Sequence, residues 1–381
     1  MNSTVKFTNK DRSQFFSTVR KRVDAYFVDN NISANANGAM WRKAIFFLLG
    51  YSLLYGLIIS NQFGVWTMLG MALLLGSFAA FIGFNVSHDA MHGAFSSQSW
   101  VNRWLGNSFY LLGASPYVWK ITHNVVHHTY TNIPGHDEDI DVAPGLIRLD
   151  PAEESHPWQR YQQFYAFPLY GLASLSWVLR KDYVKIFKEK IGQHDNSTHA
   201  KREYITLFAT KLAYYVLFLV VPMLVLDLAW WQVLVGFVAM HLIEGLILGL
   251  VFQLAHVVEG TSFPVPGDNG TIEEAWAIHQ MRTTANFAPR SAIAAFFCGG
   301  LNRQIEHHLF PKVCHIHYPA ITSIVKRTAE EHGLPYLENA TFFSALQSHY
   351  RILKQLGTAP VASSLLKNLV HHPVVEEPTL N

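Results

Sequence analysis

Residues 64–92 read GVWTMLGMALLLGSFAAFIGFNVSHDAMH, and they join a long apolar run directly to two histidines, His88 and His92. The run from 64 to 87 contains no charged side chain. A helix of about 24 residues rises roughly 36 Å, whereas the hydrocarbon core of a bilayer is about 30 Å thick. We therefore expect a membrane-spanning helix that carries both histidines just past the hydrocarbon.

Two further clusters contain histidines at short spacing, HNVVHH at 123–128 and QIEHH at 304–308. Residues three or four apart share one face of a helix, so three helices could each offer a pair of nitrogens to a shared centre. Neutral imidazole is a ligand for zinc, copper, iron and nickel. The histidines are too many for one ion, and we expect two metal ions.

The composition also favours a membrane protein. Of 381 residues, 50% are hydrophobic and only 15% are charged, whereas soluble domains carry roughly 25% charged residues. The net charge of +2 is too small to indicate nucleic-acid binding. The two cysteines, Cys298 and Cys314, form no CxxC pair, which argues against a disulfide framework or a thiolate metal site. The first forty residues are polar and mixed, so we expect no cleavable signal peptide.

The apolar runs predict an all-α, multi-pass membrane fold. Four runs are long enough to cross a bilayer, at about 43–60, 64–87, 205–226 and 228–256. Short linkers around Asn61 and Asp227 join them into two transmembrane hairpins. The weaker stretches 104–118 and 161–179 contain prolines, and we expect them to be interfacial or half-inserted. The predicted organisation is an N-terminal segment (1–40), a membrane domain (41–355) and a C-terminal tail (356–381).

Basic residues predict the orientation of these spans. The hairpin tips carry no lysine or arginine, whereas Lys10, Arg12, Arg20, Lys21, Arg22, Arg42 and Lys43 precede the first span and Arg180, Lys181, Lys185, Lys188, Lys190, Lys201 and Arg202 precede the third. The positive-inside rule then puts both termini and the central loop in the cytoplasm. All histidine clusters fall in one cytoplasmic helical layer that caps the four helices. His256 ends the fourth run on the same side, and we add it as a candidate ligand.

Residues 10–28 predict an amphipathic helix, with Phe15, Val19, Val23 and Phe27 on one face and basic residues between them. Two interpretations remain open for this helix. It could lie on a membrane surface, or it could pack its apolar face against the rest of the chain.

The motifs HDAMH, HNVVHH and QIEHH, in this order between these spans, resemble the membrane fatty acid desaturases. The flanking segments WKITHNVVHHTYTNIPGH (119–136) and GLNRQIEHHLFP (300–311) carry the same resemblance. It implies a di-iron centre that uses O₂ to remove two hydrogens from an acyl chain. The implied iron ligands are His88, His92, His123, His127, His128, His256, His307 and His308. At position 304 related desaturases have a histidine, whereas this chain has Gln304, and in this respect it resembles the front-end subgroup. Members of that subgroup introduce a double bond between an existing double bond and the carboxyl end.

This resemblance also implies partners. The substrate would be a long-chain acyl group on CoA or on a lipid, with its polar head at the cytoplasmic surface. The basic residues that flank the histidine clusters are head-group candidates: Lys120, Arg282, Arg303 and Lys312. Neither His-Pro pair is followed by Gly-Gly, the haem motif of a fused cytochrome b5 domain. We therefore expect electrons to come from a separate ferredoxin or cytochrome b5.

Three other functions are compatible with parts of this pattern. A lipid hydroxylase on the same scaffold would share the histidine motifs. A histidine-rich metal transporter is disfavoured, because transporters place polar ligands near the bilayer midplane. A zinc hydrolase is disfavoured, because eight histidines exceed the needs of one catalytic zinc.

Several polar residues have two interpretations each. His241 and Glu244, inside the fourth span, are either functional or a hydrogen-bonded pair between helices. His279 is a weak candidate for a ninth ligand, and we expect His315 and His317 to be surface residues or to support the ligands. The acidic residues Asp137, Glu138, Asp139 and Asp141 form either a solvated turn or, less expected, a set that orients the ligand imidazoles.

Overall fold

A computed structural model describes residues 5–10, 12–140, 143, 145–150 and 153–359. Most of these residues are helical, which agrees with the all-α prediction. Strands occur among them only as two-residue pairs, namely β1 (Lys6–Phe7) with β4 (Thr271–Ile272), β2 (Lys190–Ile191) with β3 (His194–Asp195), and β5 (Asn286–Phe287) with β6 (Glu338–Asn339).

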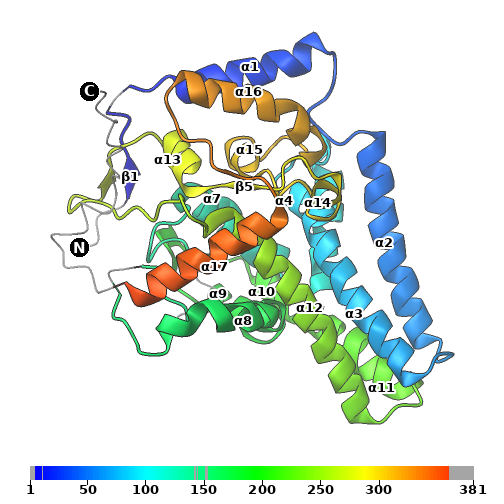
Figure 1. The fold of residues 1–381 in the computed structure, drawn as a ribbon. Helices are drawn as coiled ribbons and strands as arrows, with labels where there is room; N and C mark the ends of the chain where they lie inside the picture. The colour runs from blue at the N-terminus through cyan, green and yellow to red at the C-terminus, as the bar shows by residue number, and fades with distance from the viewer. Residues whose placement is uncertain (1–4, 11, 141–142, 144, 151–152, 360–381) are drawn as a thin grey trace.

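Within the described residues, four helices are long and apolar enough to cross a membrane. They are α2 (Gly38–Ile59); α3 (Val65–Ile82), continued by η1 (Gly83–Ser87) and α4 (His88–Met91); α10 (Lys201–Tyr215), continued by η6 (Val216–Val220) and α11 (Val221–Val225); and α12 (Trp230–His256). These helices coincide with the four predicted spans to within a few residues. Figure 1 shows α2, α3, α11 and α12 extending together from one side of a helical body.

The tips of the two hairpins contact each other. The Asn61 side chain donates to Oδ2 of Asp227 at 2.7 Å, and the Asp227 backbone N–H donates to Oδ1 of Asn61 at 3.2 Å. Asn61 has a left-handed backbone (φ 56°), which asparagine tolerates better than most residues. Both tips therefore lie at the same end of the four helices, as the hairpin prediction requires.

Glycines allow α12 to approach its two neighbours closely. A Cβ on Gly76 of α3 would lie 2.1 Å from the Met240 carbonyl oxygen of α12. A Cβ on Gly245 of α12 would lie 2.4 Å from the Gly171 carbonyl oxygen of α8 (Gln162–Ser176). Small residues permit this kind of backbone contact between membrane helices. α12 is consequently held between α3 and α8, and its last turn is fixed over the site described below.

The outer faces of these helices are apolar. Large side chains that remain exposed on them include Ile45, Leu49, Leu53, Leu74, Leu212, Leu224 and Val235. A soluble protein rarely exposes a continuous apolar surface of this kind. The hydrocarbon of a bilayer is the environment that this surface fits.

The remaining helices form the body above the spans. They are α1 (Phe15–Asp29), α5 (Ser99–Gly106), α6 (Pro116–Trp119), α7 (His128–Tyr130), α8, α9 (Asp182–Ile186), α13 (Trp276–Thr283), α14 (Ala292–Phe297), α15 (Gln304–Leu309), α16 (Tyr318–Glu331) and α17 (Phe342–Thr358), with shorter turns η2 (Asn107–Leu112), η3 (Lys120–His127), η4 (Gln159–Tyr161), η5 (Trp177–Lys181) and η7 (His315–His317). The weaker apolar stretch 104–118 breaks into short helices and turns. The stretch 161–179 forms α8 and part of η5, and α8 packs against α12. The predicted tail boundary falls inside α17, and residues 360–381 lie outside the described residues.

α1 packs on the body through its apolar face. Its four predicted apolar residues are buried in one cluster with Ile321 and Val325 of α16, and Arg22 pairs with Glu331 at 2.6 Å. The two helices lie side by side in Figure 1. Of the two interpretations of this helix, packing against the chain is therefore correct, and the face that would enter a membrane surface is already covered.

Candidate metal centre

The first histidine cluster is placed by a span that continues without a break into the body. α3 passes through the π-helical turn η1 into α4, so His88 and His92 lie on one continuous helix. Their ring centroids are 4.7 Å apart. π-Helical turns inside α-helices are frequent at functional sites, and here one precedes the first cluster directly.

The second cluster lies on a π-helical segment, η3, rather than on the regular α-helix that we expected. Trp119 stacks on the His123 ring at 4.2 Å, which fixes the orientation of that imidazole. His123 and His127 still lie on neighbouring turns, with ring centroids 4.9 Å apart. The two rings nevertheless have different neighbours, because His123 lies near His88 and His307 whereas His127 lies near His256 and His308.

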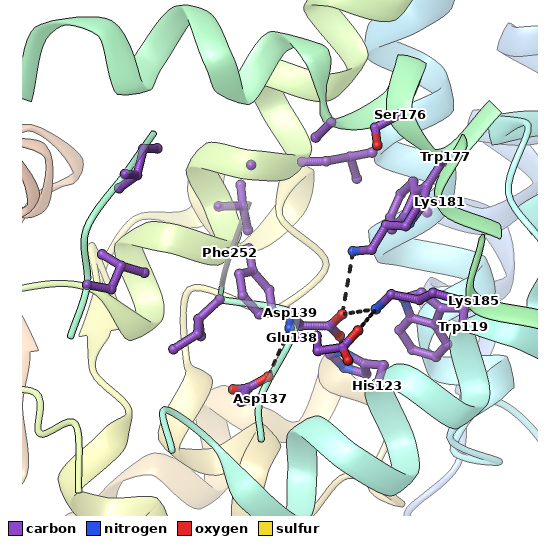
Figure 2. Close-up of a pocket in the computed structure, with 18 of the residues that line it drawn as sticks. Trp119, His123, Asp137, Glu138, Asp139, Ser176, Trp177, Lys181, Lys185 and Phe252 are labelled. Atoms are coloured by element: carbon purple, nitrogen blue, oxygen red, sulfur yellow. Dashed lines mark hydrogen bonds and ion pairs between the residues drawn. The ribbon is translucent and has the colours of Figure 1, made fainter. Parts of the chain in front are cut away.

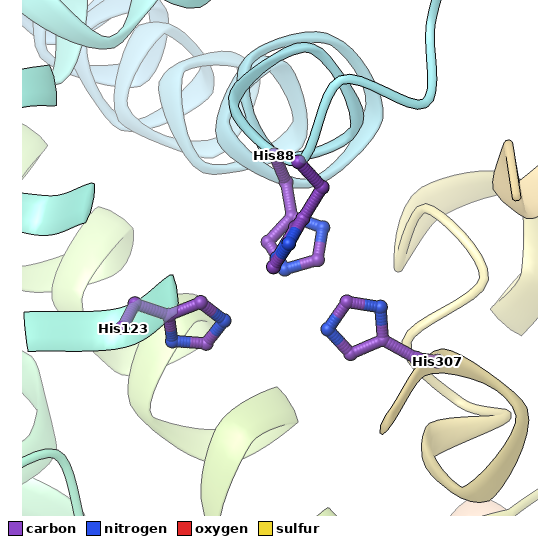
Figure 3. A group of neighbouring side chains, drawn as sticks. His88, His123 and His307 are labelled. Carbon is purple, nitrogen blue, oxygen red and sulfur yellow. The ribbon is translucent and has the colours of Figure 1, made fainter. Parts of the chain in front are cut away.

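The histidines form two main groups. In each group the ligand nitrogens lie within 4.8 Å of one another. The first histidine group is His88, His92, His123 and His307, and the second histidine group is His127, His256 and His308. Figure 3 shows His88, His123 and His307 converging from three separate elements. His128 lies between the groups, with its Nε2 atom 3.0 Å from Nε2 of His307. His128, His307 and His308 also lie within 4.8 Å of one another, so His128 joins the two groups. All eight predicted ligands therefore meet, seven of them in the two groups and His128 between them.

Five of these rings are oriented by an oxygen atom near Nδ1. The contacts are His123 with Asp139 (3.3 Å), His127 with Asp137 (2.8 Å), His256 with the Thr283 carbonyl (3.3 Å), His307 with the Tyr318 hydroxyl (3.1 Å) and His308 with the Gln280 side chain (2.7 Å). An Nδ1–H that donates to oxygen leaves Nε2 as the lone-pair atom. This arrangement is typical of metal-bound histidine.

Several buried Nε2 atoms have no hydrogen-bond partner among the described residues. They belong to His92, His123, His127 and His308. Buried polar atoms are almost always paired, and each exception needs an explanation. A metal ion in each group would supply the missing partner, and the all-imidazole donor set suits iron, zinc, copper or nickel. The residues present therefore fit two metal ions.

Burial keeps most of these imidazoles neutral, as ligands must be. Burial and the neighbouring histidines hold the pKa of His92, His128, His307 and His308 well below the ordinary value. Burial lowers the pKa of His123 to about 4, although Asp139 acts in the opposite direction. His127 differs: burial lowers its pKa, but the charge and hydrogen bond of Asp137 together with the charge of Asp139 outweigh burial, and the pKa is raised.

Gln304 lies at the edge of the second histidine group. Its Nε2 atom is 2.9 Å from Nε2 of His256, and its Oε1 atom has no partner among the described residues. The amide therefore faces the group and offers it an oxygen atom.

A cavity of about 520 Å³ leads to the histidines. His88, His123 and Gln304 contribute to its wall, beside apolar residues such as Leu248 and Phe252. The wall beside His123 also carries charged side chains, and Figure 2 shows Glu138, Asp139, Lys181 and Lys185 grouped near His123 and Trp119. A long apolar molecule with a polar end matches this lining.

The acidic run does orient imidazoles. Asp137 is buried and contacts His127, and Asp139, whose side chain is only 11% exposed, contacts His123, so the interpretation as a solvated turn is wrong. Glu138 pairs with Lys185 and Lys188 instead. Asp141 lies outside the described residues.

The other histidines lie apart from both groups. His241 bonds to the Ser174 and Tyr214 side chains of neighbouring helices and lies 3.5 Å from Glu244, which agrees with the interhelical interpretation. His279 donates to the Thr131 carbonyl, so it has another partner.

His315 and His317 are buried, which makes the surface interpretation wrong. His315 belongs to a compact polar cluster with Asp89 and Cys314. Its Nδ1 atom lies 2.8 Å from Asp89, and Nε2 lies 3.2 Å from the Lys43 ammonium. The ammonium already balances the carboxylate there, so this cluster is satisfied without a metal ion.

None of the four predicted head-group residues lines the cavity. Arg303 is buried and donates to the Pro289 carbonyl, Arg282 pairs with Glu274 at 2.9 Å, and Lys120 and Lys312 are exposed. The cations at the cavity are instead Arg180, Lys181, Lys185 and Lys188. In the sequence these residues indicated only the orientation of the spans, although the i,i+4 spacing of Lys181 and Lys185 after an apolar helix is a signal that they share a face.

Comparisons with known proteins agree with this site. The family model described as fatty acid desaturase matches residues 64–340, which include all eight histidines. The chain is 38% identical over 358 residues to the sn-1 linoleoyl-lipid 6-desaturase of Synechocystis sp., covering 93% of this chain and 98% of that relative. It is 35% identical to the sn-1 linoleoyl-lipid 6-desaturase of Arthrospira platensis (95% and 98% covered) and 36% identical to the acyl-lipid (8-3)-desaturase of Physcomitrium patens (93% and 74% covered).

These relatives are desaturases, so the hydroxylase alternative is not favoured. The chain belongs to the fatty acid desaturase family, and it is an acyl desaturase.

Proposed function

We propose that this protein is a front-end acyl-lipid desaturase, which introduces a cis double bond between an existing double bond and the carboxyl end of a lipid-bound chain. The relatives named above support this choice, because their names specify linoleoyl-lipid or acyl-lipid substrates and positions near the carboxyl end. Gln304 in the third cluster agrees with the same subgroup.

The two histidine groups would each hold one iron ion. The family is di-iron, and the unpartnered Nε2 atoms provide the donor set described above. Bound there with O₂ and two external electrons, the iron pair supplies the oxidising power that removes two hydrogens from the chain, with two protons taken up and two waters formed. Asp137, Asp139, Tyr318 and Gln280 keep the ligand rings in place by accepting or sharing their Nδ1 protons.

The cavity residues would hold the acyl chain against the first histidine group. Leu248, Val251, Phe252 and Trp119 form apolar walls, and burying each CH₂ there contributes roughly 0.8 kcal/mol. The same walls exclude water, which keeps the oxidant from side reactions. The single observation that carries this function is that His88 and His123 belong both to the cavity wall and to the first histidine group.

We place the histidine layer and both termini on the cytoplasmic side, because the basic residues flank the spans at that end and the Asn61 and Asp227 tips carry none. Electrons would come from a separate ferredoxin or cytochrome b5. The chain has only two cysteines, fewer than the four thiolates that an iron–sulfur cluster ordinarily needs.

Expression in a host that supplies such a donor tests the proposal. Lipids from cells given linoleate are analysed by mass spectrometry with double-bond localisation. One new cis double bond on the carboxyl side of the existing ones is expected, and it should disappear in His308→Ala but not in His279→Ala, a buried histidine outside both groups. A hydroxylated product, or a new double bond on the methyl side, would contradict the proposal.

A further inference from the structure

Lys185 is a buried cation in the wall of the cavity. It belongs to α9, its side chain is only 7% exposed, and Figure 2 shows it beside Trp119 with its ammonium directed toward Glu138 and Asp139. Burial lowers its pKa to about 8, so the ammonium remains mostly protonated at neutral pH. Lysine is rarely buried without a compensating partner, and this position therefore needs a reason.

The neighbours of Lys185 balance its charge without fully satisfying its three donors. Its Nζ atom lies 3.4 Å from Glu138 and 3.9 Å from Asp139, and it makes no hydrogen bond to any residue that the structure describes. An ammonium has three N–H donors. Leaving such donors buried and unpaired is unfavourable.

Lys211 shows how a buried lysine is otherwise satisfied in this protein. It is equally enclosed, and its Nζ atom donates to the carbonyls of Gly113 and Trp177 at 2.6 Å and pairs with Asp182 at 2.8 Å. Lys185 lacks such acceptors and borders an open cavity instead. Its missing acceptor is therefore expected to come from the molecule that fills the cavity.

The ammonium is close to the first histidine group. One carboxylate separates them, because Oδ1 of Asp139 faces Lys185 while Oδ2 lies 3.3 Å from Nδ1 of His123. Because the path through Asp139 consists of contacts of 3.9 and 3.3 Å, we expect only a short run of methylenes between an atom bound at Lys185 and a carbon held at the histidines. A short run of this kind is consistent with a double bond near the carboxyl end of the chain.

We propose that Lys185 donates a hydrogen bond to the ester carbonyl oxygen of the bound acyl chain and thereby determines the position of the new double bond. The role rests on the proposed function. A carbonyl suits the site because it is an uncharged acceptor, and Glu138 and Asp139 already balance the ammonium.

Substitution of Lys185 tests this role in whole cells. Lys185→Met keeps the length of the side chain but removes the donor, and we expect about a tenfold rise in the share of product with the double bond at neighbouring positions, the effect of losing one hydrogen bond. Lys185→Gln retains an N–H donor and should restore most of the positional fidelity. Lys190→Met, an exposed lysine outside the cavity, is the matched control and should behave as the wild type. Iron content should stay unchanged in all three variants.

A substrate analogue tests the same role in the unaltered enzyme. An ether-linked lipid, identical except that it lacks the carbonyl, should be desaturated with lower positional fidelity and a higher KM than the ester. This measurement decides the matter even if Lys185→Met fails to fold. Unchanged position and KM with the ether lipid would overturn the role of Lys185 alone, whereas the absence of any new double bond in the wild type would overturn the proposed function and this role together.

Discussion

The Nδ1 atom of His127 lies 2.8 Å from Oδ2 of Asp137, and both side chains are completely buried. The same carboxylate accepts the backbone N–H groups of Asn132 at 2.9 Å and of Asp139 at 3.0 Å. These bonds fix the carboxylate before any ligand binds. The ring of His127 is consequently held with Nε2 directed at the second histidine group.

Replacing Asp137 should weaken metal binding in that group. Asp137→Asn keeps the size of the side chain but removes the charge that supports the imidazole, and we expect metal affinity to fall by about 10- to 100-fold. Iron retained after dialysis against a graded chelator measures the effect. Glu138→Gln, at the adjacent carboxylate that contacts lysines rather than histidines, is the control. Equal retention of iron by Asp137→Asn and the wild type would contradict the orienting role.

Gln304 should act through its oxygen atom. His256 donates its Nδ1–H to the Thr283 carbonyl, so its Nε2 carries the lone pair and accepts from the Gln304 amide. A metal bound at that nitrogen replaces this hydrogen bond, and the amide must turn to present Oε1. We expect Gln304→Leu to lose about tenfold or more in affinity for the second metal, whereas Gln304→Glu, which keeps an oxygen, retains it. Metal titration of the stripped protein distinguishes the two, and tight binding by Gln304→Leu would exclude a ligand role.

His349 should make the attachment of α17 sensitive to acid. Its Nδ1 donates to the Val257 carbonyl at 2.6 Å, and its Nε2 is 2.8 Å from the Tyr170 hydroxyl. Burial lowers its pKa to about 4, whereas an unfolded histidine titrates near 6.5. The contribution of neutral His349 to the free energy that holds α17 in place is therefore complete above about pH 6.5. It falls by an amount on the order of 3 kcal/mol as the pH approaches 4.

Hydrogen exchange of the α17 amides between pH 7 and pH 4 measures this loss. His349→Gln is the comparison, because an amide can donate to Val257 and does not titrate. Exchange of α17 in the wild type should accelerate more steeply with acidity than in His349→Gln, after correction for the intrinsic rate. Parallel pH profiles would show that His349 does not control the attachment.

The purified chain should not turn over with NAD(P)H alone. Under the proposed function, the two electrons of each turnover come from a separate donor protein. Addition of ferredoxin or cytochrome b5 with its reductase should start desaturation of a lipid substrate in detergent or vesicles, as followed by mass spectrometry. Sustained turnover without a donor protein would contradict the need for a partner.

The sequence predicted the spans well because their signal is local. The uncharged run from 64 to 87 precedes His88 directly, and this signal does not depend on tertiary packing. The linkers at Asn61 and Asp227 are so short that the helices they join must form hairpins. The meeting of all eight histidines followed from the topology. Their division into two groups did not, because it depends on the π-helical turn at Lys120–His127, which the apolar pattern does not signal.

Residues whose role depends on distant packing were missed or misjudged. Asp137 and Asp139 were expected to be solvated because acidic runs usually are, yet their carboxylates contact the rings of His127 and His123. Lys185 contributed only to the predicted orientation, since its burial requires α9 to pack against the 138–139 segment. The face of α1 was ambiguous until α16, about 300 residues further along the chain, was seen to cover it.

The metal content of the purified protein tests the central claim most directly. Elemental analysis of the wild type should give about two irons per chain, because each histidine group provides one set of imidazoles. His92→Ala, in the first histidine group alone, and His127→Ala, in the second histidine group alone, should each retain about one iron. A single zinc in the wild type would contradict a centre built from two separate histidine groups. Two irons still bound in both variants would contradict it as well.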